Sequence, residues 1–340
     1  MDTLTQALLG GAVGYVVAGK QTPRKALLWG AAIAVLPDLD VFIPYEDDLT
    51  AITMHRSWTH SWLIQTLVAP LLAYGMHRFD TRLQLHTWCW LIWLVLITHS
   101  GLDALTVYGT QLFWPFMPPP VSGGSIFIID PIYTASLLAG FIGVVVLPDS
   151  NSSRRWLLSG FVFSCCYLLW GLTAQNWVEQ QARTALAKHN IAYNNILVGA
   201  TPFNSLLWRV LVIDDEHYYQ GFRSVFDPSD DFNFSQYDRH SDLKTPVENL
   251  ASFERLDWFT HGFYAMQQHD SRIIATDLRM GIEPIYFFRF QLAEVNNDNS
   301  VTPFPSQRIR SQSWSLKNLG WLWQRVWDPD AQLVIQFKQD

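Results

Sequence analysis

Three short clusters of aspartate and histidine lie within or beside apolar segments of this chain. Their sequences are Pro37-Asp38-Leu39-Asp40, His55-Arg56-Ser57-Trp58-Thr59-His60 and His99-Ser100-Gly101-Leu102-Asp103. Ionisable side chains at membrane depth are costly, so by default they indicate a functional site. Carboxylates and imidazoles gathered at one depth are most simply explained by a bound cation, because both groups are ligands of divalent metals.

The first cluster offers two carboxylates. Pro37 disfavours helical angles for Leu36, so we expect the following segment to be extended. Side chains two apart in an extended segment point the same way, which would let Asp38 and Asp40 share one cation. The alternative is a turn at a helix end with two solvated acids.

The second cluster offers two imidazoles. His55 and His60 are five residues apart, so on one helix they would diverge by about 140°. We therefore expect His55 in a loop and His60 at the start of a helix with Thr59 or Ser57 as its N-cap. The alternative is a pair of histidines at the membrane interface.

The third cluster has the spacing of neighbours on one helix face. His99 and Asp103 are four residues apart, which suits half of a zinc or manganese site. The alternative is a buried His–Asp hydrogen bond. Asp130, in Ile128-Ile129-Asp130-Pro131, has three possible roles: metal ligand, hydrogen-bond partner of a ligating histidine, or helix N-cap.

Together these side chains exceed the needs of one tetrahedral ion, so we expect one or two ions. A metal-bound water with a lowered pKa would be the nucleophile, and a carboxylate that binds no metal could accept its proton. The sequence contains no Gly-x-Ser-x-Gly elbow and no phosphate-binding Gly-rich loop. Serine-hydrolase and nucleotide-binding functions therefore have no support.

Charge divides the chain into two unlike halves. Residues 1–175 contain 8 Lys and Arg and 10 Asp and Glu, whereas residues 176–340 contain 15 and 20. This split predicts an all-α membrane domain over 1–175 and a water-exposed domain over 176–340. The net charge of −7 and the lack of a basic run argue against nucleic acid as a partner.

The apolar segments and the loops between them predict six transmembrane helices. The segments span approximately 4–19, 26–43, 61–76, 86–105, 126–147 and 156–175. Every second loop is rich in Lys and Arg, whereas the alternate loops contain only Arg56. By the positive-inside rule, both termini and all the Asp and His clusters then lie on the outer side. A re-entrant hairpin over the first two segments is less favourable, because its tip would place the basic loop 20–25 in hydrocarbon.

The second half has the composition of strands. Stretches rich in β-branched and aromatic residues are separated by turn formers, which predicts a β-rich (α+β), mostly antiparallel, extracytoplasmic domain. Residues 227–255 are polar and are predicted to form a long loop or a helical insertion. The predicted strands are Asn194–Val198, Leu206–Ile213, His217–Ser224, Arg272–Asp277 and Pro284–Glu294.

The clusters and their surroundings resemble the bacterial inner-membrane metal-dependent hydrolases of the YdjM type, also called LexA-binding, inner-membrane-associated hydrolases. The resemblance covers about the first 150 residues. It rests on the three clusters and on Met1-Asp2-Thr3-Leu4-Thr5-Gln6, Tyr108-Gly109-Thr110-Gln111-Leu112-Phe113-Trp114-Pro115-Phe116 and Ile126-Phe127-Ile128-Ile129-Asp130-Pro131. The tail, with Thr201-Pro202-Phe203-Asn204-Ser205-Leu206-Leu207-Trp208, resembles the long-tailed branch.

The resemblance implies metal dependence. The matching ligands here are Asp38, Asp40, His55, His60, His99 and Asp103. Many members have histidine at the position of Gln6; glutamine is a poor zinc ligand, so Gln6 is left out of the site. Asp2 and Asp130 are candidates for supporting the ligands. The link to LexA is not carried over, because the predicted topology places the site on the other side of the membrane.

The sequence therefore predicts a membrane hydrolase that uses zinc, or alternatively manganese. We expect it to cleave an ester or phosphoester in a lipid-linked or amphiphilic substrate, in contact with membrane lipid. Asp40, Asp103 and Arg56 are the expected catalytic residues, and Arg56 would offset anionic charge or pair with Asp38 or Asp103. The alternatives are a metal-stapled scaffold that binds a partner and, less favoured, a transporter.

Overall fold

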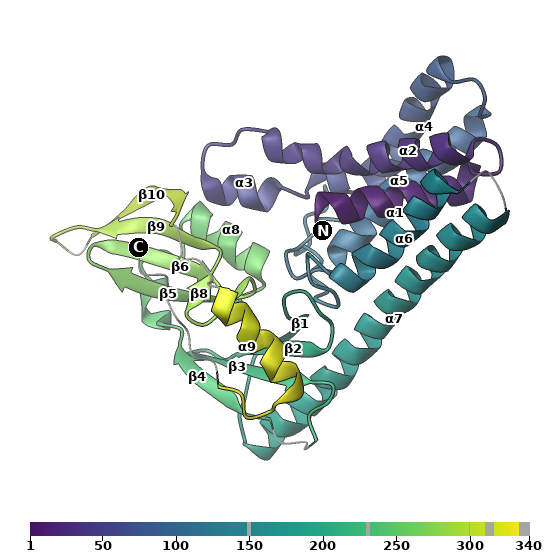
Figure 1. The fold of residues 1–340 in the computed structure, drawn as a ribbon. Helices are drawn as coiled ribbons and strands as arrows, with labels where there is room; N and C mark the ends of the chain where they lie inside the picture. Colours follow the sequence, from purple (N-terminus) through teal and green to yellow (C-terminus); the bar gives the residue numbers. More distant parts are fainter. Residues whose placement is uncertain (148–150, 229–231, 299, 310–315, 333–340) are drawn as a thin grey trace. The chain divides into compact units, whose positions relative to one another are not determined.

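The computed structural model describes residues 1–147, 151–228, 232–298, 300–309 and 316–332 (Figure 1). The chain divides into two compact units. The first comprises Met1–Ile43 and His55–Leu172, and the second comprises Pro44–Met54 and Thr173–Asp340. This division differs from the predicted halves 1–175 and 176–340, because residues 44–54 belong to the second unit.

The first unit is helical, as predicted, and a helix forms at each of the six apolar segments. Among the described residues, only α5 and the long α7 are long and apolar enough to cross a membrane, in place of the six helices expected. Helices α1 and α6 are apolar but shorter. The six helices are α1 (Thr3–Ala18), α2 (Pro23–Val35), α4 (Trp62–Phe79), α5 (Leu85–Ala104), α6 (Pro131–Val146) and α7 (Asn151–Lys188).

Small residues bring α1 and α2 into close contact. A Cβ added at Gly30 of α2 would lie 2.1 Å from the carbonyl oxygen of Gly10 in α1, and one at Gly14 would lie 2.4 Å from that of Ala26. The absence of side chains at Gly10, Gly14 and Gly30 therefore allows the two helix backbones to pack closely. Helix α1 also packs against α5 and α6 (Figure 1), so it lies at the centre of the helical core.

Two short 3-10 helices carry the first two Asp and His clusters. These are η1 (Pro37–Phe42) and η2 (Trp58–His60). The prediction of an extended segment after Pro37 is wrong, because Leu36 has helical angles (φ −58°, ψ −43°) and the chain continues as a 3-10 turn. Residues two apart in a 3-10 helix are about 240° apart, so Asp38 and Asp40 point in different directions.

The second unit is β-rich, in agreement with the sequence. Its two four-stranded antiparallel sheets have the orders β1-β2-β3-β4 and β10-β9-β6-β5. The strands are β1 (Asn195–Ala200), β2 (Leu207–Ile213), β3 (His217–Ser224), β4 (Phe234–Asp238), β5 (Tyr264–His269), β6 (Arg272–Asp277), β9 (Arg289–Val295) and β10 (Val301–Arg308). A short hairpin joins β7 (Gly281–Ile282) to β8 (Ile285–Tyr286).

Helices complete the second unit. They are α3 (Asp48–Met54), the end of α7 from Thr173 to Lys188, the 3-10 helix η3 (Ser241–Lys244), α8 (Ala251–Thr260) and α9 (Leu316–Trp327). Leu49 of α3 is buried in one apolar core with Phe253 of α8 and Phe290 of β9, which explains why residues 44–54 belong to this unit. The predicted loop or helical insertion at 227–255 contains β4, η3 and the start of α8.

Candidate metal site

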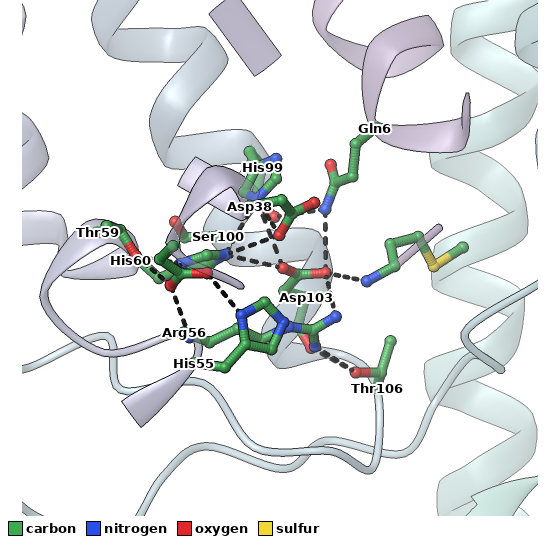
Figure 2. A network of polar contacts seen from close by, with 12 residues as sticks. Gln6, Asp38, His55, Arg56, Thr59, His60, His99, Ser100, Asp103 and Thr106 are labelled. Atoms are coloured by element: carbon green, nitrogen blue, oxygen red, sulfur yellow. Dashed lines mark hydrogen bonds and ion pairs between the residues drawn. The ribbon is translucent and has the colours of Figure 1, made fainter. Parts of the chain in front are cut away.

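Four ligand atoms from separate parts of the first unit converge at one point (Figure 2). They come from Asp38 of η1, His60 of η2, and His99 and Asp103 of α5, and all lie within 4.8 Å of one another. His60 Nε2 lies 3.1 Å from His99 Nε2, 3.2 Å from Asp103 Oδ2 and 3.4 Å from Asp38 Oδ1. His99 Nε2 lies 3.5 Å from both carboxylate oxygens.

These separations fit a metal ion. At metal–ligand bonds of about 2.0–2.1 Å, neighbouring ligand atoms around tetrahedral zinc lie about 3.3 Å apart. The five separations that involve His60 or His99 are 3.1–3.5 Å. Asp38 Oδ1 and Asp103 Oδ2 are buried and make no hydrogen bond with the described residues. Buried polar atoms normally have a partner, and a cation at this point would serve both oxygens.

The surroundings of Asp103 direct one of its oxygens to the cluster. The other oxygen, Oδ1, receives Gln6 Nε2 at 3.0 Å, Arg56 Nη2 at 3.2 Å and the Met1 amino group. Asp103 and His60 are fully buried, whereas the Asp38 side chain is 16% exposed. The cluster is therefore most accessible from the side of Asp38.

Arg56 is held by the protein on several sides. Its backbone adopts a left-handed conformation (φ 62°), and its N–H donates to Asp40 Oδ2 at 3.0 Å. Its guanidinium binds Asp103 and donates to Thr106 Oγ1 at 3.3 Å, 4.9 Å from the centre of the Tyr108 ring. Of the two roles expected for Arg56, the structure contains the ion pair with Asp103.

Asp40 and His55 form a separate pair beside the cluster. Asp40 Oδ1 lies 2.6 Å from His55 Nδ1, and Asp40 Oδ2 accepts the Thr59 hydroxyl at 2.6 Å in addition to the Arg56 N–H. The His55 and His60 rings are 6.0 Å apart. The predicted six ligands thus separate into four convergent residues and one hydrogen-bonded pair.

The candidate supporting residues Asp2 and Asp130 both act as helix N-caps. Asp2 accepts the Thr5 N–H at the start of α1. Asp130 accepts the N–H groups of Ile132 and Tyr133 at the start of α6, and its other oxygen accepts the Tyr167 hydroxyl at 2.8 Å. Of the three roles considered for Asp130, the structure contains the N-cap.

Sequence reasoning missed three groups that contact the ligands. Gln6, excluded as a ligand, donates to Asp103 and to the His99 carbonyl oxygen, and its position in the amino-terminal motif was the available signal. The Met1 amino group had no such signal. Thr59 was expected to cap a helix, but the N-cap of α4 is Ser61, which accepts the Ile64 N–H.

Electrostatics favour a positive charge between the ligands. Burial opposes protonation of His60, but the neighbouring Asp103 and Asp38 carboxylates raise its pKa overall. The carboxylates therefore favour a positive charge at His60, which a proton can supply. A metal ion can take the place of that proton, because metal ligands bind in their deprotonated form.

Comparisons with known proteins agree with the sequence-based resemblance. The sequence model of a family described as YdjM inner membrane protein matches residues 1–178. An uncharacterised protein of Bacillus subtilis (strain 168), YfhP, is 26% identical over 231 residues, covering 65% of this chain and 68% of that protein. The inner membrane protein YbcI of Escherichia coli (strain K12) is 34% identical over 113 residues, covering 33% of this chain and 64% of YbcI. No solved structure matches the chain.

Proposed function

Because the chain belongs to the YdjM inner membrane protein family, we propose that it is a metal-dependent hydrolase of the bacterial inner membrane. Its substrate class would be an ester or phosphoester within a lipid-linked or amphiphilic molecule. The observation that carries the proposal is the tetrad of Asp38, His60, His99 and Asp103, whose ligand atoms lie close enough together to share one metal ion.

In the proposed topology the six apolar segments all enter the membrane, including the four whose helices are shorter or less apolar than α5 and α7. The tetrad and the second unit lie on the outer side. The support for this topology is the distribution of Lys and Arg, which are concentrated in every second loop. His99 and Asp103 lie in the last two turns of α5, a helix apolar enough to span the membrane. A site at that depth favours an amphiphilic substrate over a freely soluble one.

In the proposed chemistry, the tetrad holds zinc or manganese, which when bound supplies a Lewis acid and lowers the pKa of water. Arg56 holds Asp103 in place, because it binds that carboxylate directly. The proton acceptor is the Asp40–His55 pair, in which Asp40 orients an imidazole that is 21% exposed. A histidine positioned in this way is a common general base.

A second candidate is a non-catalytic scaffold in which the metal joins η1, η2 and α5. The observation in its favour is the complete burial of the His60, His99 and Asp103 side chains. A structural site has a closed ligand shell, whereas a catalytic site keeps a position open for water or substrate.

Metal content and hydrolysis together test the proposal. The full-length protein, purified in mild detergent, should contain zinc or manganese by elemental analysis, and both His99→Ala and Asp38→Ala should lose it. His86→Ala is the control, because His86 lies in the first turn of α5, at the opposite end from His99 and Asp103, and its Nε2 lies 3.4 Å from the neighbouring Thr87 hydroxyl. Equal metal content in all four proteins would overturn the metal site. Assays with phosphatase, phospholipase and esterase substrates then distinguish an enzyme from a scaffold. An enzyme should turn over one of these substrates, and its His55→Ala variant should lose that activity while retaining metal.

A further inference from the structure

We propose that Thr59 is a positioning residue that fixes the tautomer of His60 through a hydrogen-bond relay from Asp40. The inference rests on the proposed metal site and concerns how that site is prepared for its ion. The relay joins the Asp40–His55 pair to the tetrad (Figure 2).

The relay begins at Asp40, whose carboxylate can only accept hydrogen bonds when it is ionised. It receives three donors: His55 Nδ1 at 2.6 Å, the Arg56 N–H at 3.0 Å and the Thr59 hydroxyl at 2.6 Å. Asp40 is 5% exposed, so these contacts are shielded from competing water. The Thr59 hydroxyl hydrogen is therefore directed to Asp40.

The second contact of Thr59 then determines the protonation of His60. Thr59 Oγ1 lies 2.9 Å from His60 Nδ1, and a hydroxyl has one hydrogen to donate. Because that hydrogen is directed to Asp40, Thr59 can only accept from His60. His60 Nδ1 must carry the hydrogen, and in the neutral imidazole Nε2 keeps its lone pair.

This tautomer is the one that a metal requires. His60 Nε2 is the atom that faces Asp38, His99 and Asp103. Ligating histidines commonly donate their other ring nitrogen to a partner that fixes the tautomer and the ring orientation. His60 has such a partner, whereas His99 Nδ1 makes no hydrogen bond with the described residues.

The chain contains a matched control in its other ligating histidine. Thr98 precedes His99 as Thr59 precedes His60. The Thr98 hydroxyl donates to carbonyl oxygens of its own helix, Leu94 at 2.7 Å and Val95 at 3.1 Å. Replacing Thr98 by valine removes the same group next to a ligand without interrupting a relay.

The experiment measures zinc affinity of the full-length protein in detergent by competition with a chromophoric chelator. Thr59→Val should weaken binding about 10–100-fold, the usual effect of losing such a partner. Thr59→Ser, which restores the hydroxyl, and Thr98→Val should both bind zinc as the wild type does. If Thr59→Val binds with unchanged affinity, the relay is wrong.

A second substitution covers the case in which Thr59→Val fails to fold. In Asp40→Ala the Thr59 hydroxyl has lost its acceptor, which frees its hydrogen for His60 Nδ1 and moves the imidazole hydrogen to Nε2. We expect a similar loss of zinc affinity, and unchanged affinity in folded protein would overturn the inference. Wild-type protein that binds neither zinc nor manganese would instead refute the proposed metal site, so the two failures are distinguishable.

Discussion

Arg56 and Asp103 form a buried ion pair, with Arg56 Nη2 3.2 Å from Asp103 Oδ1 and side chains that are 5% and 0% exposed. The two carboxylate oxygens of Asp103 therefore have different partners. Oδ1 is occupied by protein donors, and Oδ2 faces His60 and His99. The Asp103 carboxylate thus takes part in a buried ion pair through one oxygen and is a candidate metal ligand through the other. The stability of the protein should therefore depend on both Arg56 and the metal ion.

Removing Arg56 should destabilise the metal-free protein. In Arg56→Met the buried Asp103 carboxylate loses a compensating charge, a change that typically costs about 3–5 kcal/mol. Thermal unfolding in detergent should show a large decrease in melting temperature with chelator present. The decrease should be smaller with zinc, because the positive ion offsets the charge of the same carboxylate. Arg82→Met is the control, since the Arg82 side chain is 60% exposed. Equal stability of Arg56→Met and the wild type without metal would contradict this account.

Gly30→Ala should disturb the site from a distance. The new Cβ would lie 2.1 Å from the Gly10 carbonyl oxygen and would push α1 away from α2, at a cost of about 1–3 kcal/mol. Because α1 carries Gln6, metal content should fall together with thermal stability. Gly75→Ala in α4 is the control, because nothing lies within 4 Å of the added Cβ. It should lower neither the metal content nor the thermal stability. A Gly30→Ala protein with wild-type stability and metal content would refute the close packing.

Asp130→Ala should weaken the fold without emptying the metal site. Loss of the N-cap bonds to Ile132 and Tyr133 should reduce stability by about 0.5–2 kcal/mol. Asp130→Asn should retain most of the stability, because asparagine also caps helices. Elemental analysis should find the same metal content in both variants as in the wild type. A folded Asp130→Ala protein without metal would restore the ligand role that the sequence left open.

Much of the fold was accessible from sequence because its signals are local. Apolar runs placed the helices of the first unit, and β-branched runs placed β1, β2, β3, β6 and most of β9. Strands β4, β5 and β10 were missed, because Phe234–Asp238, Tyr264–His269 and Val301–Arg308 are polar or interrupted by proline. Their pairing with neighbouring strands, which no short stretch specifies, determines their conformation.

The boundary between the two compact units had no such local signal in the sequence. Residues 44–54 lie between two apolar segments and were predicted as part of an outer loop of the membrane domain. The structure assigns them to the second unit because Leu49 is buried against Phe253 and Phe290, which lie more than 200 residues further along the chain.

The sequence by itself determined which residues can act as ligands and that His99 and Asp103 share one helix face, because the helical repeat is a local property. Only the tertiary structure decided that these two meet Asp38 and His60, while Asp40 and His55 form their own pair. The physical reason is that the 3-10 turn after Pro37 rotates Asp40 away from Asp38, and that Asp40 then meets His55 and Thr59, 15 and 19 residues away. The direction of a single hydroxyl hydrogen in that contact determines which nitrogen of His60 carries the imidazole hydrogen.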